Sequence, residues 1–214
     1  LWVKENEPEI FAKVHKWLDV KEAIIARMTK EFIMSEDSAF ATLIYDMRSK
    51  EKVFSNSVMK MLGVDPKHMP KIISSEDVAG YLTKESADEL GLKEGIPVYA
   101  GGGDASLIGV GAGAIMPGDT HVYMGTSGWV STVTTKTLID TNAMVASVVG
   151  AFEGKYNYFA ELETAGKCLE WVKDHMVVDE INAYIEKKSI TETEALYTSL
   201  YEYLSDVMLR AKPG

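Results

Sequence analysis

The residues best suited to chemistry are three glycines and an acid at positions 101–104, which follow a short apolar run. The run, residues 96–100, predicts a buried strand. Glycines at the end of a strand let a ligand or another backbone segment come close, and α/β proteins bind ligands at the carboxyl ends of strands. Asp104 could therefore serve as a base, although the local pattern alone favours a tight turn in which it caps the next helix.

A second polar turn, residues 125–128, lies between two apolar strand halves. Its Gly-Thr-Ser-Gly sequence offers several backbone N–H donors and two hydroxyls, which is the kind of concavity that holds phosphate oxygens. Serine and glycine are also common in plain hairpin turns, so this turn alone leaves both interpretations open. A base in one turn and phosphate donors in another are two of the parts that phosphoryl transfer needs.

Three other patterns are less informative. The spaced glycines of residues 109–113 resemble a dinucleotide-binding loop, but they lie inside an expected helix and no strand-ending acid follows at the proper distance. Ser35, Asp37 and Ser38 could form a functional loop, but a cap or turn is favoured. No metal-binding residue is predicted, because the histidines are scattered without ligand spacing and are expected to be structural or on the surface: His15, His68, His121 and His175.

The elements that must position these residues change in kind near a turn at residues 116–119. Before this turn, helical periodicity alternates with short strands; after it come strands of period two, and helices follow. The sequence therefore predicts an α/β fold with a lobe boundary there. Helices are predicted from Pro8 through Leu18 and at 21–30, 55–62, 84–90, 105–114, 164–176, 179–187 and 191–210. Strands are predicted at 78–83, 96–100, 121–130, 144–152 and 156–162, and residues 35–39 are expected to be a polar break.

The composition is that of an ordinary globular protein. The 214 residues are 46% hydrophobic and carry a formal net charge of −10. This acidic balance argues against nucleic acid or a membrane surface as a partner, and no apolar stretch approaches the ~18 residues of a membrane span. One cysteine, Cys168, permits no internal disulfide, which fits the cytoplasm. The absence of an initiator methionine and the abrupt end at Gly214 suggest a fragment of a longer protein.

Several stretches together resemble the FGGY family of carbohydrate kinases, and most closely its xylulokinases. Residues 96–131, IPVYAGGGDASLIGVGAGAIMPGDTHVYMGTSGWVS, are similar to the family's central strand, G-G-G-D turn, glycine-rich helix and phosphate-binding G-T-S turn. The resemblance includes the start of the chain, where the end of a family signature is similar to LWVKEN. It also includes the family's S-D-A-S-G-T-L-L-F-D run, which resembles the stretch EDSAFATLIYDMRSKEKVFSNSVMKMLGVDPKHMPKI. GKYNYFAELETAGKCLEWVKDHM resembles a strand and nucleotide-facing helix of the second lobe, so the resemblance covers nearly the whole chain.

The resemblance implies a two-lobe α/β fold of the ribonuclease H-like, actin-like ATPase type, truncated here at both ends, with ATP and sugar between the lobes. Residues 1–116 would be the C-terminal half of lobe I, which carries the catalytic acid, and residues 117–214 the first part of the nucleotide-binding lobe II. Asp104 matches the catalytic base. The positions that match substrate contacts are Gly103, Asp104, Ala105 and Trp129. The positions that match ATP contacts are Gly125, Thr126, Ser127, Gly128, Gly166 and Glu170.

The implied reaction uses ATP and Mg²⁺ to phosphorylate a sugar hydroxyl, converting D-xylulose to D-xylulose 5-phosphate. Many relatives have Asn or Gln after the catalytic acid, and Ala105 at that position leaves gluconate, ribulose, glycerol or another polyol open. A non-catalytic, actin-like nucleotide-binding module is the alternative from a different class.

Two further expectations concern the chain as a fragment. A phosphate-gripping loop of lobe I is missing, so the 214 residues alone are expected to be inactive. A truncated lobe should also expose apolar surface, which favours a homodimer or a larger oligomer. In the active protein, Asp104 and the turn at residues 125–128 should face each other across a gap that holds the triphosphate.

Overall fold

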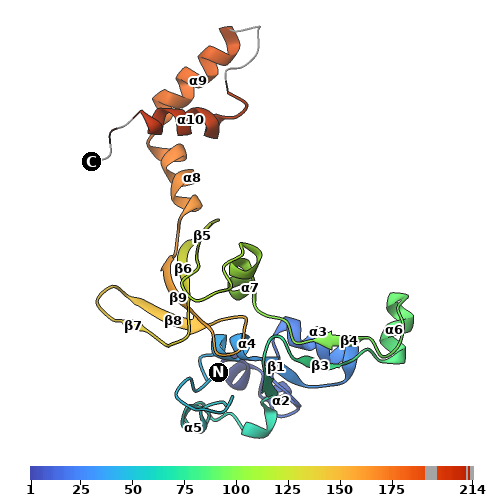
Figure 1. Ribbon diagram of the computed structural model, residues 1–214. Coiled ribbons are helices and arrows are strands. Elements are labelled where there is room, and N and C mark those ends of the chain that lie inside the picture. Colours follow the sequence, from blue (N-terminus) through green and yellow to red (C-terminus); the bar gives the residue numbers. More distant parts are fainter. Residues whose placement is uncertain (191–196, 211, 213–214) are drawn as a thin grey trace. The chain divides into compact units, whose positions relative to one another are not determined.

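The computed structural model describes residues 1–190, 197–210 and 212 (Figure 1). The chain divides into two compact units. The first contains Leu1–Tyr123 and Trp129–Glu161, and the second contains Met124–Gly128 and the described part of Leu162–Gly214. Most of the strands after residue 116 therefore pack within the first unit. The division of the chain into two lobes at residue 116 stays a prediction.

The helices of the first unit are short, and local signals set several of their ends. Asp19 caps α3 by accepting from the Val20 N–H, Thr83 caps α6, and Gly91 ends α6 in the left-handed conformation. These helices are α1 (Trp2–Asn6), α2 (Pro8–Phe11), α3 (Val20–Thr29), α4 (Glu36–Ala41), α5 (Asn56–Leu62), the 3₁₀ helix η1 (Pro66–His68), α6 (Lys84–Leu90) and α7 (Asp104–Gly111).

Two predictions for the first forty residues of this unit are wrong. The helix expected from Pro8 through Leu18 ends at Phe11, because the Trp17 N–H donates to the carbonyl of His68 (2.8 Å) and its ring packs against a buried cluster. The expected polar break at residues 35–39 instead contains the end of a strand and most of α4. In both places a contact with a distant segment outweighs the local preference.

In the described residues the strands form three sheets, and the largest contains the antiparallel pairs expected from period two. Val148 of β8 (Val145–Val149) pairs with Asn157 of β9 (Tyr156–Leu162), and the turn of this hairpin at residues 153–154 was predicted. A parallel pair joins β1 (Ile33–Ser35) and β2 (Lys71–Ile73), and an antiparallel pair joins β3 (Val78–Tyr81) and β4 (Pro97–Tyr99). The five-stranded sheet has the order β5 (Thr120–Met124), β6 (Gly128–Thr134), β9 (Tyr156–Leu162), β8 (Val145–Val149) and β7 (Ile139–Asp140).

The prediction that residues 96–100 form a buried strand is wrong for most of its length. Tyr99 is 57% exposed and Pro97 is also exposed, because β4 pairs only with β3 and presents one face to solvent. Only the end of the run enters the core: Ala100 is 1% exposed and packs with Ile25 of α3 and Ala79 of β3. This small cluster fixes the point where the glycine-rich loop begins.

The second unit contains α8 (Gly166–His175), α9 (Val178–Ile190) and α10 (Leu200–Leu209). Tyr203 and Leu204 of α10 are buried, and the ring of Tyr184 from α9 lies 5.5 Å from that of Tyr203. In the described residues α10 begins after Ser199, which accepts from the Glu202 N–H, so the helix is shorter than predicted. The predicted capping box at Thr191 lies outside the described residues.

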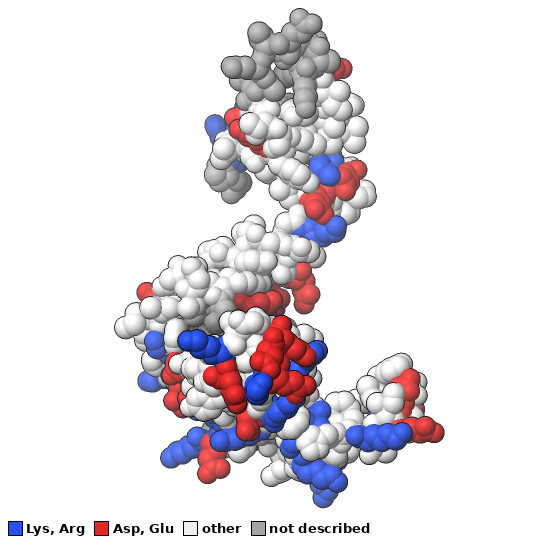
Figure 2. Space-filling model, turned by 90° about the vertical axis from the view of Figure 1, so that its right-hand side faces the viewer, with Lys and Arg blue, Asp and Glu red and all other residues white. Residues whose placement is uncertain are grey.

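The surface carries charges of both signs. On the face shown in Figure 2, acidic and basic side chains are interspersed. Across the part of the chain that the structure describes, no helix has the length and apolar character needed to cross a lipid bilayer.

Candidate active site

The loop that carries the predicted catalytic acid is built from the end of β4 and the start of α7. Two backbone hydrogen bonds join the start of this loop to a neighbouring loop. The N–H of Ala100 donates to the carbonyl of Asp77, and that of Gly101 to the carbonyl of Ser75, both at 2.9 Å. Gly101 has φ +64°, a conformation that a residue with a side chain rarely adopts. The extended Gly103 then caps α7, which starts at Asp104.

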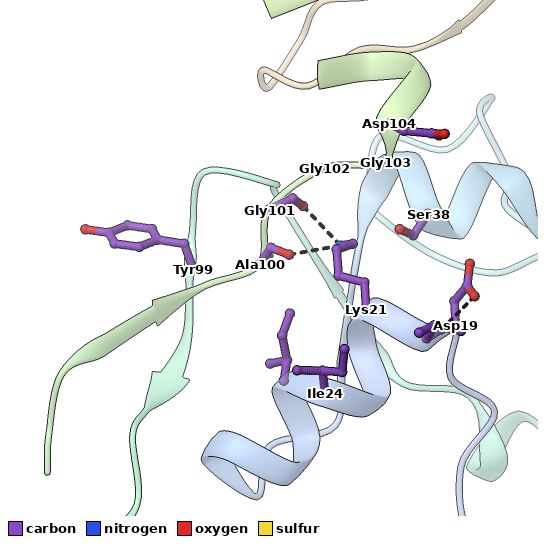
Figure 3. A pocket seen from close by; sticks show the side chains of 12 residues that line it. Asp19, Lys21, Ile24, Ser38, Tyr99, Ala100, Gly101, Gly102, Gly103 and Asp104 are labelled. Carbon is purple, nitrogen blue, oxygen red and sulfur yellow. Dashed lines mark hydrogen bonds between the residues drawn. The ribbon is translucent and has the colours of Figure 1, made fainter. Parts of the chain in front are cut away.

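Lys21, in the first turn of α3, holds the loop from one side (Figure 3). Its ammonium donates to the carbonyls of Ala100 (2.9 Å) and Gly101 (3.1 Å) and to the hydroxyl of Ser35 (2.8 Å). The fully buried carboxylate of Glu22 lies 2.8 Å from the same nitrogen. A lysine in the first turn of a helix opposes the helix dipole, and this was a signal in the sequence that the side chain has a specific partner.

Asp37, in the first turn of α4, holds the loop at its other end. Its Oδ2 accepts from the Gly103 N–H at 2.6 Å, and its side chain leaves no room for a Cβ on Gly102, which would lie 2.9 Å from Oδ2. The residue is 7% exposed. Sequence reasoning favoured a cap or turn role for this segment and did not connect it with the glycine loop, since the two lie 66 residues apart.

Asp104 itself is exposed, with its Oδ1 accepting from the N–H of the following Ala105 at 2.8 Å. Gly103, not Asp104, is the capping residue of α7, so the simple cap interpretation does not describe its position. Asp104 lies on the wall of an open cavity of about 610 Å³ that also includes Ser38 and Tyr99. Gly103 shares this wall, while Trp129 is not among the described residues that line it.

Trp129 instead packs against aromatic side chains of the neighbouring strands in the five-stranded sheet. Its ring stacks on Tyr123 with centroids 4.0 Å apart and lies 5.3 Å from Phe159. Its indole N–H donates to Nε2 of His121 at 3.1 Å. These contacts give Trp129 a structural role in β6, and its predicted contact with substrate stays a prediction.

The turn at residues 125–128 belongs to the second unit and is bound to the start of α8. The N–H groups of Ala165 and Gly166 donate to the carbonyls of Thr126 (2.9 Å) and Gly125 (2.8 Å). A Cβ on Gly166 would lie 2.5 Å from the Gly125 oxygen, so the two backbones can meet only because residue 166 is glycine. The structure thus brings the turn and Gly166 together, while their predicted contact with ATP stays a prediction.

A cavity of about 280 Å³ opens beside this contact. It brings together four of the six residues predicted to bind ATP and adds two that sequence reasoning missed, Lys167 and Tyr201. Lys167 forms an ion pair with Glu170 at 2.7 Å, and this pair raises the pKa of the lysine. The lining residues are Gly125, Thr126, Gly166, Lys167, Glu170 and Tyr201.

The side chains around the two cavities differ in what they could hold. The second cavity offers the Thr126 residue and the Lys167 ammonium, which suit phosphate oxygens. Within residues 1–190, 197–210 and 212, no three acidic, histidine or cysteine side chains are grouped as metal ligands. Asp104 and Thr126 lie in different compact units, so the prediction that they face each other stays a prediction.

Comparison with known proteins defines the class. Residues 1–111 match the N-terminal domain of the FGGY family of carbohydrate kinases, and the chain therefore belongs to this family. Curated relatives include the xylulose kinase of Escherichia coli K12, 27% identical over 96% of this chain and 42% of the relative. The gluconokinase of Bacillus subtilis 168 is 24% identical over the whole chain and 39% of the relative. The chain thus spans about two fifths of the length of these relatives.

Solved structures show the same fold. A crystal structure of a "xyloylose kinase" from Brucella ovis has a TM-score of 0.74 and 26% identity, covering 81% of this chain and 35% of that one. The glycerol kinase of Plasmodium falciparum with ADP has a TM-score of 0.71 and 18% identity, covering 90% and 39%. The predicted family and the predicted actin-like α/β fold class are therefore confirmed.

Proposed function

We propose that the whole protein containing this chain is an ATP-dependent sugar kinase that converts D-xylulose to D-xylulose 5-phosphate. The observation that carries the proposal is the exposed Asp104, placed on a cavity wall by a loop whose backbone is held at both ends. Several relatives are xylulose kinases, which supports this sugar, and the relatives named gluconokinase and L-fuculokinase make other polyols the first alternatives.

In this proposal Asp104 accepts the proton of the attacking sugar hydroxyl. A carboxylate is a weak base toward an alcohol, so proton transfer comes late, after the loose phosphoryl transition state has developed. Positioning therefore supplies most of the acceleration. Gly103 and Ala105 flank the acid and would contact the sugar together with Trp129. Because the residue after the acid is alanine, the sugar must find its hydrogen-bond partners elsewhere.

The phosphate tail would lie against the contact between the turn at residues 125–128 and the start of α8. Thr126 and the glycines at 125 and 166 line the small cavity there, and these neutral groups suit the close approach of phosphate oxygens. Glu170 of α8 lines the same cavity with its charge paired to Lys167. Ser127 and Gly128 complete the predicted ATP-binding set. When bound, Mg²⁺-ATP supplies the transferred phosphoryl group and the charge that neutralises its oxygens.

The test is a sugar-dependent ADP-release assay on the whole protein. D-xylulose, D-ribulose, gluconate, glycerol and L-fuculose are compared at saturating Mg²⁺-ATP, and kcat/KM is measured for each. D-xylulose should give the largest kcat/KM, and chelation of the divalent cation should abolish turnover. A larger value for another sugar would correct the substrate, and no sugar-dependent ADP release with any of them would refute the kinase proposal.

A further inference from the structure

Asp37 is a buried carboxylate that the proposed reaction does not use directly. It accepts four hydrogen bonds, two from residues beside it in the sequence, one from the loop that contains Ser75 and one from the glycine loop. Oδ1 accepts from the hydroxyls of Ser35 (2.6 Å) and Ser75 (3.2 Å) and from the N–H of Ser38 (2.9 Å). Oδ2 accepts from the N–H of Gly103 (2.6 Å). One oxygen is therefore anchored locally, and the other reaches across to the loop that ends in Asp104.

We propose that Asp37 is a positioning residue for phosphoryl transfer, which sets the direction of Asp104 by holding the amide of Gly103. The inference rests on the proposed function, because it needs Asp104 to be the base. Hydrogen bonds to a carboxylate are stronger than those between neutral groups, and burial strengthens them further. Gly103 directly precedes Asp104. A hydrogen bond that fixes the Gly103 amide therefore leaves the backbone of Asp104 little freedom to move.

The loop is held from both ends by one connected network. The ammonium of Lys21 holds the carbonyls of Ala100 and Gly101, and it also donates to the buried Ser35 hydroxyl. Ser35 in turn donates to Asp37. The two anchors are thus joined through Ser35. Figure 3 shows the Lys21 end of this network, with dashed lines from its ammonium to the carbonyls of Ala100 and Gly101. A loop without side chains of its own gains from these contacts the rigidity that a catalytic group requires.

The chemistry of the site requires a carboxylate at position 37. The side chain receives one N–H at each oxygen, from Ser38 and from Gly103. Asparagine has a single oxygen, so in either orientation its NH₂ group would face one of these two N–H donors. The serine hydroxyls can turn to accept, but a backbone N–H cannot. The variant Asp37→Asn therefore loses one anchor while it keeps the size of the side chain.

The experiment is a double-mutant cycle in the whole protein with the best sugar found in the panel. Asp37→Asn should lower kcat by about 10- to 100-fold, with the KM for ATP changed by less than about threefold. In the Asp104→Asn background the same substitution should have almost no further effect, because both changes act through one group. Additive losses, or normal kcat in Asp37→Asn, would overturn the inference.

Asp77→Asn is the matched control. The Asp77 side chain accepts from the Ser74 N–H in the same neighbouring loop, while only the backbone carbonyl of Asp77 binds the Ala100 N–H. This variant makes the same chemical change on a side chain that does not contact the glycine loop and should retain wild-type kcat. A loss equal to that of Asp37→Asn would mean that any change of charge near the loop reduces activity, and the specific role of Asp37 would be rejected.

Hydrogen exchange separates the contact from the chemistry. In wild type and Asp77→Asn the Gly103 amide should be protected, and in Asp37→Asn it should exchange at least about tenfold faster. Equal protection in all three proteins would overturn the contact itself, whatever the enzyme does. If exchange changes as expected but wild type phosphorylates none of the sugars, the contact stands, whereas the proposed function and the catalytic role of Asp37 both fall.

Discussion

At the residue scale, the glycines before Asp104 are needed for different reasons. Gly101 has a positive φ, whereas Gly102 has no room for a side chain. A Cβ at position 102 would lie 2.9 Å from Oδ2 of Asp37 and 3.2 Å from Leu107. The run of glycines therefore lets the buried carboxylate approach the loop, in addition to any room it leaves for a ligand.

The substitution Gly102→Ala should lower both stability and turnover. The added methyl group must displace either the Asp37 carboxylate or the loop, and overpacking of this kind costs about 1–3 kcal/mol. Thermal unfolding and kcat of the whole protein measure the two effects. Gly111→Ala is the control, because a Cβ there meets nothing within 4 Å and its φ is not positive. Equal behaviour of the two variants would show that Gly102 is not packed as described.

At the element scale, α7 is held against the sheet through a glycine and a histidine. A Cβ on Gly109 would lie 2.9 Å from the imidazole of His121 in β5, so the helix can approach only at a glycine. His121 is 5% exposed, and its Nε2 accepts from Trp129 of β6. The helix that starts with Asp104 is thus fixed at its first turn by the loop and at its second by this contact.

Burial of His121 should make the fold sensitive to mild acid. Burial lowers the pKa of His121 below its ordinary value of 6.5. Below pH 6.5 His121 binds a proton in the unfolded chain more readily than in the folded chain. The free energy of unfolding is therefore unaffected by His121 above that pH and falls as the pH drops through it. In His121→Gln, the decrease in melting temperature between pH 7.5 and pH 5.5 should become smaller. An unchanged decrease would show that His121 does not contribute to it.

Elements with complete local signals could be predicted from the sequence. The helix α3 has periodic apolar residues, and α6 has the Thr83 cap and the Gly91 stop. The strand β9 was predicted at its exact bounds from alternation alone. Because these signals lie within each element, the observed bounds of these elements differ little from the predicted ones.

Elements that depend on distant contacts could not be predicted. The parallel pair β1–β2 joins three-residue strands some 38 positions apart, such as Ile33 and Lys71, and strands this short carry no periodicity. The same holds for the site: the chemistry of Asp104 is visible in the sequence, but the contact of Asp37 with Gly103 exists only through the fold. The sequence therefore showed which group could react and left open what holds it in place.

At the scale of the whole molecule, the chain forms two compact units with separate buried residues. The first has its clusters around Met34 and Ile25, and the second is centred on Tyr203 and Leu204. In its described residues the second unit contains three helices, and it contributes the small cavity beside the turn at residues 125–128. A change in its core should therefore affect this small cavity before it affects Asp104, which belongs to the first unit.

The variant Tyr203→Ala should destabilise the second unit selectively. Tyr203 is 7% exposed and packs against Tyr184 and Tyr197, and removal of a buried aromatic side chain costs about 3–5 kcal/mol. Hydrogen exchange should accelerate in α8–α10 while α3 and β1 stay protected. Leu209→Ala, at a position that is 84% exposed, is the control and should change little. Equal acceleration in α3 would show that the chain unfolds as one unit.

The proposed kinase reaction needs Asp104 as its base, and one comparison of variants tests this role directly. In the whole protein, Asp104→Asn should lower kcat for sugar phosphorylation by at least about 100-fold, while the Kd for ATP stays nearly constant. The exposed Asp88→Asn on α6 makes the same chemical change away from the cavity and should keep wild-type kcat. Turnover by Asp104→Asn close to that of wild type would contradict the account.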